Sequence, residues 1–242
     1  MNDGALPKTP ATAAAPASAR ILVWDLPVRV FHWLLVASFA GAWITGEADQ
    51  WRLWHVTLGY TVLALIALRL AWGVVGTRYA RFSSFVRGPA AVLDYLRSVL
   101  RGQAQHYTGH NPAGAVAVVA LLLLGLALGI SGWATYAGAG GEAYEEVHEV
   151  LATTMLVIVG LHIVGVIAGS WIHRENLVGA MFSGRKRGAP ADGIEGDRRG
   201  LGILLLAAVL GFWWWQPRHP DQGLAHTGAA PASQGNAQGD KD

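Results

Sequence analysis

Four histidines lie inside or at the edges of long apolar runs in this 242-residue chain: His32, His55, His148 and His162. A side chain that ionises near neutral pH is costly in hydrocarbon, so a histidine in a membrane segment indicates a functional site and needs a partner. Neutral imidazoles bind metals, and two of them suit the axial positions of a haem iron. These four side chains are therefore the first candidates for chemistry.

The composition predicts an all-α membrane protein, because 52% of the residues are hydrophobic, 14% are charged and 11 are tryptophan. A membrane helix needs roughly 20 apolar residues. Four runs meet that length, near residues 27–46, 54–75, 112–133 and 147–171. A fifth run, residues 201–215, is short, but arginines precede it and three tryptophans close it. We expect a four-helix transmembrane bundle with a fifth C-terminal spanning helix, the alternative for that run being an interfacial or re-entrant segment.

Charge patterning orients these runs, because short cytoplasmic loops collect Lys and Arg. Basic residues follow the second run (Arg78, Arg81, Arg87, Arg97, Arg101) and the fourth (Arg174, Arg185, Lys186, Arg187, Arg198, Arg199). The opposite connections are acidic (Glu47 and Asp49 with only Arg52, then Glu142, Glu145, Glu146 and Glu149). We expect a multi-pass protein of a bacterial inner membrane with a cytoplasmic N-terminus. Five spans place the tail in the periplasm, and four would return it to the cytoplasm.

The segments outside the apolar runs are of three kinds. Residues 1–20 and 216–242 are rich in small and polar residues, which predicts a disordered cytoplasmic N-terminus and a disordered tail. Pro89 is a plausible first helical residue and Gly102 a plausible stop, so we expect a short amphipathic helix on the cytoplasmic surface. We assign the histidines outside the runs to solvated surface (His106, His173, His219, His226).

Depth pairs the four histidines two by two. His162 follows His148 by fourteen residues, which is about 21 Å along a helix and nearly four turns, so both lie on roughly one face. His55 and His148 each begin a run that starts on the outer side, and His32 lies near the inner end of the first run. We therefore pair His55 with His148 near the outer surface, and His162 with His32 in the inner half.

Two neutral imidazoles from facing helices suit a haem wedged between them, since no other protein ligand is needed. Zinc would require two further ligands. The chain has no cysteine, which excludes disulfides, iron–sulfur ligation and covalent haem attachment. Gly59, Gly165 and Gly41 lie roughly on the histidine faces, where a flat macrocycle approaches the backbone. Close helix packing is the alternative for the glycines, as the spacings of Gly125 with Gly129 and of Gly165 with Gly169 indicate.

The order of these motifs resembles the bacterial cytochrome b561 and nickel-iron hydrogenase b-type cytochrome family over residues 21–188. The matching residues are Trp24-Asp25, Pro27, Arg29 and His32-Trp33, then His55 with Gly59, Gly109-His110-Asn111-Pro112, His148, His162 and the stretch from Asn176 to Arg187. The resemblance implies a dihaem transmembrane domain with two non-covalent b haems, ligated by His32 with His162 and by His55 with His148. Residues 189–215 are then a linker and the fifth helix.

Two further residues are candidates for cofactor binding. Arg29 lies one turn before His32 and suits a haem propionate, the alternative being an anchor at the inner surface. His110 suits a quinone pocket or a propionate. Asn111 and Pro112 are more simply explained as a helix N-cap and a first helical residue.

These observations predict a dihaem cytochrome b that relays electrons between the quinone pool and a periplasmic redox protein, either a c-type cytochrome or a hydrogenase-like protein. We expect membrane lipid around the protein and no nucleic-acid partner. A homodimer is one possible oligomeric state. Three alternatives are a self-contained quinone-linked oxidoreductase acting on a small molecule such as superoxide, a metal or proton transporter that uses the histidines, and a membrane anchor whose histidines are vestigial.

Overall fold

A computed structural model describes residues 19–139 and 141–219 of the chain. The expected disordered ends fall largely on residues 1–18 and 220–242, outside the described part. Five long helices dominate the fold: α1 (Leu26–Thr45), α2 (Arg52–Val75), α5 (Pro112–Tyr136), α6 (Glu142–Ile172) and α8 (Arg199–Trp215). All five are long and apolar enough to cross a membrane, α8 when counted through to Arg218. The prediction of a helical membrane bundle with a fifth C-terminal helix is confirmed.

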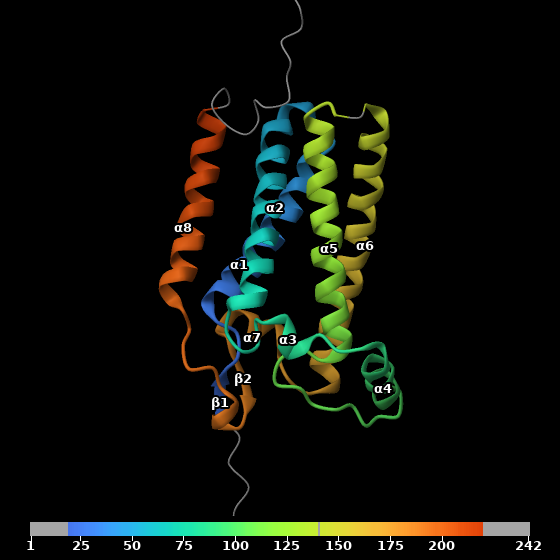
Figure 1. Ribbon diagram of the computed structural model, residues 1–242, viewed down its shortest axis with the longest axis vertical. Coiled ribbons are helices and arrows are strands. Elements are labelled where there is room, and N and C mark those ends of the chain that lie inside the picture. The colour runs from blue at the N-terminus through green and yellow to red at the C-terminus, as the bar shows by residue number, and fades with distance from the viewer. Residues whose placement is uncertain (1–18, 140, 220–242) are drawn as a thin grey trace, which may run out of the picture.

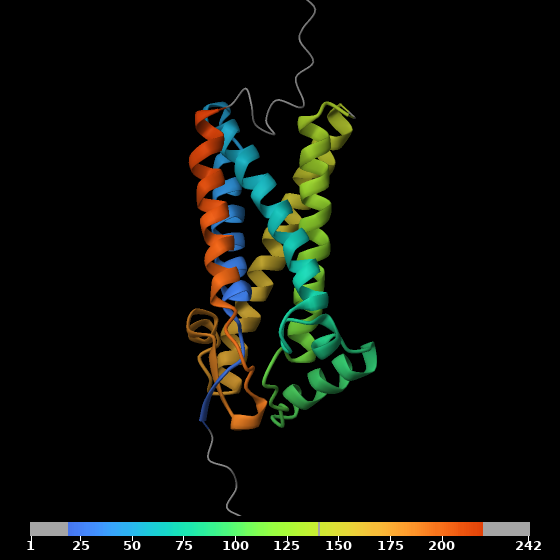
Figure 2. The same cartoon turned by 60° about the vertical axis from the view of Figure 1, so that its left-hand side comes forward.

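The long helices run roughly side by side along the longest axis of the molecule (Figure 1). Helix α1 packs along α2 and α8, α2 packs along α5, and α5 packs along α6. Figure 2 shows α1 and α8 together on one side, α5 on the other, and α2 crossing between them. Helices α1 and α6 make at most marginal backbone contact with each other, although each carries one histidine of the inner pair.

The basic loops gather at one end of the bundle, the lower end in Figure 1. Here lie the short helices α3 (Phe82–Phe85), α4 (Pro89–Leu100) and α7 (Leu177–Ser183) and the 3-10 turn η2 (Pro190–Asp192). The expected amphipathic helix is α4, and it begins at the predicted proline. The opposite end holds the turns η1 (Asp49–Trp51) and η3 (Gln216–Arg218).

A two-stranded antiparallel sheet ties the ends of the predicted haem domain together at the basic end. Strand β1 (Ala19–Leu22) pairs with β2 (Arg185–Gly188), with Ala19 opposite Gly188 and Leu22 opposite Arg185. Gly184, just before β2, has a φ of +75°, and a Cβ there would lie 2.6 Å from the carbonyl oxygen of Trp24. Glycine therefore permits the close turn that brings β2 against the start of α1.

The start of α1 is fixed by the residues of the Trp24-Asp25-x-Pro27 motif. Asp25 caps the helix by accepting a hydrogen bond from the backbone N–H of Val28 at 2.9 Å, and a proline follows in the first turn. Asn111 caps α5 in the same way, accepting from the N–H of Gly114 at 2.7 Å. The N-cap interpretation of Asn111 and Pro112 is confirmed.

The fifth helix is attached to the bundle by specific contacts. Trp213 on α8 donates a hydrogen bond from Nε1 to Thr61 Oγ1 on α2 at 2.9 Å. A Cβ on Gly202 would lie 2.5 Å from the side chain of Leu26, so the glycine lets α8 approach the start of α1 closely. The predicted linker before α8 contributes too, because the N–H of Leu26 donates to the carbonyl oxygen of Asp197 at 2.9 Å.

Candidate functional site

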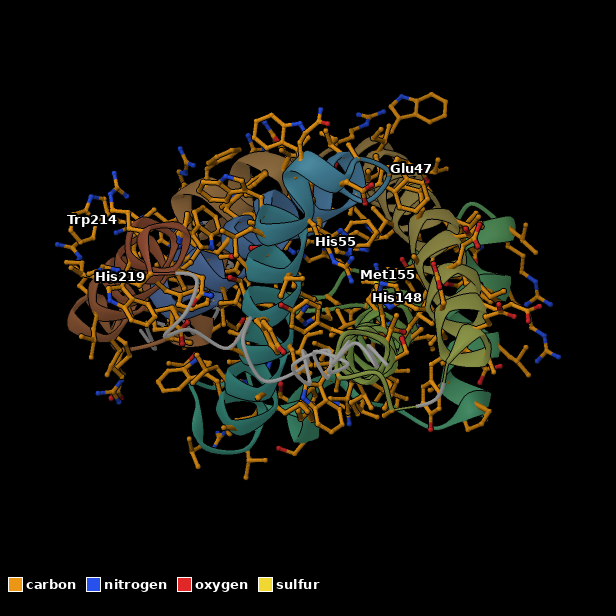
Figure 3. All side chains as sticks on the ribbon, turned by 90° about the horizontal axis from the view of Figure 1, so that it is seen from above. Glu47, His55, His148, Met155, Trp214 and His219 are labelled. Atoms are coloured by element: carbon orange, nitrogen blue, oxygen red, sulfur yellow. The ribbon has the colours of Figure 1, made fainter. Side chains whose placement is uncertain are left out.

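The outer pair of histidines meets between α2 and α6. The rings of His55 and His148 lie with centroids 6.1 Å apart and planes at 85°. Figure 3, seen from the upper end of the bundle in Figure 1, shows both side chains turned toward the same interior space. Two imidazoles that bind one metal ion through bonds of about 2 Å have ring centroids roughly 6 Å apart, and the observed separation matches that value.

Hydrogen bonds leave the same nitrogen of each outer histidine free. His55 Nδ1 lies 2.8 Å from the carbonyl oxygen of Ala42, which can only accept, so Nδ1 carries the proton. The Ser131 hydroxyl donates to the carbonyl oxygen of Leu128 at 2.9 Å and therefore accepts from His148 Nδ1 at 3.0 Å. In both rings Nε2 keeps its lone pair for a metal, the arrangement that ligating histidines generally show.

The inner pair comes from α1 and α6. His32 and His162 are close enough to interact electrostatically. His32 Nδ1 is buried, and it has no hydrogen-bond partner among the described residues. A buried polar nitrogen without a partner is costly in a protein interior. A bound group that engages this imidazole would remove that cost, so the inner site fits an additional ligand as well.

The glycines divide between two roles. A Cβ on Gly59, one turn after His55, would meet nothing within 4 Å, and the same is true of Gly165, three residues after His162. Both positions leave open space beside a histidine, and the approach of a flat group there stays a prediction. Gly41 differs, since a Cβ there would lie 2.7 Å from Leu58 Cδ1, so its face is filled by α2. Gly125 and Gly129 meet Ile66 and Leu63 of α2, which confirms helix packing for that pair.

Gly132 is a further glycine that positions a candidate ligand. A Cβ at this position would lie 2.8 Å from His148 Cε1 and 3.2 Å from Nδ1. The absence of a side chain at this position of α5 therefore lets the imidazole approach that helix closely, where it reaches Ser131. Sequence reasoning missed Ser131 and Gly132. The available signal was a pair of small residues near the end of the third apolar run, at the same depth as His148 at the start of the fourth.

Arg29 has protein partners. Its guanidinium donates from Nη1 to the carbonyl oxygen of Phe182 and from Nη2 to Asp197 Oδ1, both at 2.8 Å. Its Nε is buried without a hydrogen-bond partner among the described residues. These contacts join α1 to α7 and to the segment before α8, so they support the anchoring interpretation more directly than contact with a propionate.

His110 lies at the inner end of the bundle, just before α5. Its ring contacts Trp24 at 4.6 Å and Phe85 at 4.5 Å between centroids, and Nδ1 is buried without a partner among the described residues. Burial, reinforced by the positive charges of Arg69 and Lys186, lowers the pKa of His110 to about 3. The imidazole is thus neutral and one of its nitrogens is unpaired.

His173 was assigned to solvated surface from the sequence, and the structure corrects this assignment. The residue is half-buried, with Nε2 3.3 Å from the Tyr95 hydroxyl.

Arg69 on α2 is the charged residue that sequence reasoning did not single out. Its side chain is almost fully buried, with 5% exposed, and its guanidinium lies 5.1 Å from the ring centroid of Phe82. The signal in the sequence was an arginine inside the second apolar run.

Within the described residues, no group of three or more His, Asp or Glu side chains gathers as a metal site. In the described part of the chain, the two histidine pairs therefore have no third His, Asp or Glu beside them.

A bundle of membrane-spanning helices with histidines facing one another between them is typical of one class, the integral-membrane haem proteins. The family model for prokaryotic cytochrome b561 matches residues 23–184, and the chain belongs to this family. It is a membrane b-type cytochrome that functions in electron transfer and binds haem b, and it is a multi-pass bacterial membrane protein. The predicted family is confirmed.

Curated relatives carry one recurring name. A probable Ni/Fe-hydrogenase B-type cytochrome subunit of Rhodobacter capsulatus is 24% identical over 214 residues, covering 69% of this chain and 81% of its own. One from Rhizobium leguminosarum is 25% identical over 211 residues, covering 69% and 88%. A probable Ni/Fe-hydrogenase 1 B-type cytochrome subunit of Escherichia coli is 28% identical over 141 residues, covering 47% and 59%. No solved structure matches the chain.

Proposed function

We propose that this cytochrome holds two b haems and relays electrons across the membrane between the quinone pool and a redox protein on the periplasmic side. His55 with His148 binds the outer haem, and His32 with His162 binds the inner one. The observation that carries the proposal is the 6.1 Å separation of the His55 and His148 rings, with each Nδ1 held by a hydrogen bond and each Nε2 free. Each haem iron, when bound, carries one electron and no proton.

The protein's contribution is ligation, orientation and exclusion of water. The carbonyl of Ala42 and the hydroxyl of Ser131 fix the ring orientation of the outer ligands. Gly59 and Gly165 leave space beside the histidines. The fourteen-residue spacing on α6 sets the two sites about 21 Å apart in depth, so that a pair of haems there bridges most of the hydrocarbon thickness.

The partner on the outer side is a hydrogenase-like protein or a c-type cytochrome. Curated relatives are named as hydrogenase cytochrome subunits, which supports the first of these. The start of α6 also exposes four carboxylates that can attract a basic partner surface (Glu142, Glu145, Glu146, Glu149). The basic end of the bundle then faces the cytoplasm together with the N-terminus, following the distribution of arginines.

The test is a reduced-minus-oxidised optical spectrum of the detergent-purified protein with a pyridine haemochrome assay. Two b haems per chain are expected. Alanine at His55 or His148 should each remove one haem, and alanine at His32 or His162 should each remove the other. One haem per chain would overturn the dihaem assignment, and none under haem-replete expression would overturn the whole proposal.

Addition of a quinol tests the link to the quinone pool. When purified protein with both haems oxidised is mixed with a quinol analogue, the haems should be reduced within the mixing time of the instrument. The reduced protein should then pass electrons to an added periplasmic hydrogenase or c-type cytochrome partner. Slow reduction by quinol together with rapid reaction with superoxide would favour the small-molecule oxidoreductase instead.

An alkaline phosphatase fusion at residue 219 should be active if the C-terminal end of α8 is periplasmic.

A further inference from the structure

Helix α2 places a charged residue at the depth of the inner haem site. Arg69 follows His55 by fourteen residues, the same interval that separates His148 from His162 on α6. The interval is about 21 Å in depth and brings the side chain back to nearly the same helix face. The face of α2 that presents His55 to the outer site therefore presents Arg69 toward the inner one.

Arg69 has no counter-ion of its own among the described residues. Its side chain is 5% exposed, its guanidinium lies over the ring of Phe82 at 5.1 Å, and Nη1 is buried without a hydrogen-bond partner. The carboxylate that interacts with it electrostatically is Asp25, and that group already accepts three hydrogen bonds from other residues. A buried guanidinium without an anionic partner is strongly destabilising.

Neighbouring groups show which part of the bundle Arg69 faces. The ring of His110 lies 4.5 Å from that of Phe85, which packs 5.7 Å from Phe82, the ring that Arg69 covers, so Arg69 and His110 flank the same aromatic pair. His110 Nδ1 is buried and has no partner in the described part of the chain, which supplies a second donor or acceptor. The other buried cation nearby, Lys186, is neutralised by Glu175 at 3.0 Å and is not available.

We propose that Arg69 binds a propionate carboxylate of the inner haem, with His110 donating a second hydrogen bond to the same carboxylate. The assignment rests on the proposed dihaem function. A guanidinium presents parallel N–H donors that match a carboxylate in a bidentate pair. Such a pair satisfies the buried charge of Arg69 and the unpaired nitrogen of His110 together. A haem held by His32 and His162 would thereby gain a third and a fourth protein contact, at Arg69 and His110.

A free anion or a lipid phosphate has the same charge as a propionate, so the test removes the haem carboxylates chemically. Purified protein is loaded with haem b or with its dimethyl ester, and the rate of haem loss from each site to apomyoglobin is measured. The site lost in the His162→Ala variant identifies the inner haem. Arg69→Gln is compared with Arg97→Gln, a control at an exposed arginine near the same end of the molecule.

Arg69→Gln should accelerate loss of natural haem from the inner site about tenfold or more, because a charge-assisted hydrogen bond is removed. It should leave loss of the dimethyl ester almost unchanged, and Arg97→Gln should affect neither. Equal acceleration of both haems would overturn the proposal in favour of another anion or a role in folding, and so would no acceleration.

A second readout covers the case in which Arg69→Gln does not accumulate. In protein carrying haem labelled with carbon-13 at the propionate carboxylates, Arg69→Lys should shift one labelled carboxylate band in the infrared redox-difference spectrum. An unchanged band would overturn the assignment. A wild-type protein without haem would instead contradict the proposed function, so the two failures are distinguishable.

Discussion

The indole of Trp72, in the last turn of α2, donates a hydrogen bond from Nε1 to Asp25 Oδ2 at 3.0 Å, and Asp25 is the N-cap of α1. Thr77 Oγ1 donates to the same oxygen at 2.7 Å, while Oδ1 accepts from the N–H of Val28. One fully buried carboxylate thus joins the start of the first spanning helix to the end of the second. This junction sets the position of α1 relative to α2, and so of His32 relative to the inner site.

Asp25→Ala should destabilise the protein by about 3 kcal/mol, because three buried donors lose their acceptor. The expected result is a lower melting temperature in detergent and less protein in the membrane, measured by intrinsic tryptophan fluorescence and by a tagged protein blot. Asp94→Asn, at an exposed carboxylate of α4, is the control and should change the stability by less than about 0.5 kcal/mol. If Asp25→Ala were as stable as Asp94→Asn, the three hydrogen bonds to Asp25 would make no measurable contribution to the stability of the protein.

Gly59 tests whether the space beside His55 receives the cofactor. Gly59→Leu introduces a side chain where, apart from the adjoining residues and backbone of α2 itself, no described atom lies within 4 Å of the added Cβ. If a haem lies there, the leucine displaces it, and the outer haem should be lost while the fold persists. The pyridine haemochrome assay should therefore fall from two haems per chain to one.

Gly211→Leu on α8 is the matched control, since a Cβ at this position also meets nothing within 4 Å. It should retain both haems, because α8 carries none of the four histidines. Full haem content in Gly59→Leu would contradict a macrocycle on the His55 face of α2. Loss of haem in both variants would mean that leucine at a membrane glycine disturbs the bundle in general.

Ser131 holds His148 through its hydroxyl, so Ser131→Ala should weaken the outer haem site. The variant removes the hydroxyl that accepts from His148 Nδ1–H, and loss of such an outer-sphere partner typically costs about 10-fold to 100-fold in metal affinity. The rate of haem transfer to apomyoglobin measures the effect at each site. The inner haem should be unaffected.

Ser38→Ala controls for the loss of a buried serine, because Ser38 donates only to the carbonyl oxygen of Leu34 in its own helix. Its haem retention should match that of the wild type. An outer haem held equally well in Ser131→Ala and wild type would mean that Ser131 does not orient the ligand.

Apolar run length predicted the spanning helices to within a few residues, since hydrocarbon thickness constrains them directly. The largest difference is at α6, which begins at Glu142 instead of near Val147. Its first turn carries Glu142 and Glu145, and negative side chains stabilise a helix N-terminus, so the helix extends beyond its apolar part. Hydropathy alone does not contain that information.

Contacts between distant segments were beyond the sequence analysis. Arg29 meets Asp197 across 168 positions, and β1 pairs with β2 although a whole bundle separates them. Glycines on a histidine face could not be sorted by spacing either, because Leu58 fills the space at Gly41 while Gly59 stays open. Depth along each helix was predictable from the rise per residue, whereas the identity of the facing side chain depends on how the helices pack.

His173 makes the stability of the basic end depend on pH. Burial, together with the positive charges of His106 and Lys186, lowers the pKa of His173 below its usual 6.5, while Glu175 acts in the opposite direction. In the unfolded chain the imidazole binds a proton near pH 6.5, whereas in the folded protein it does so only at lower pH. The contribution of His173 to stability is therefore present above pH 6.5 and is lost as the pH falls below it.

The melting temperature of the purified protein should thus decline between pH 7.5 and pH 5.5, and less so in His173→Gln, which keeps a polar group near Tyr95 without a titrating charge. The difference between the two profiles isolates this histidine from the others. His219→Gln, at the opposite end of the bundle, is the control and should follow the wild-type profile. If His173→Gln declined as steeply as the wild type, the pH dependence would arise from another group.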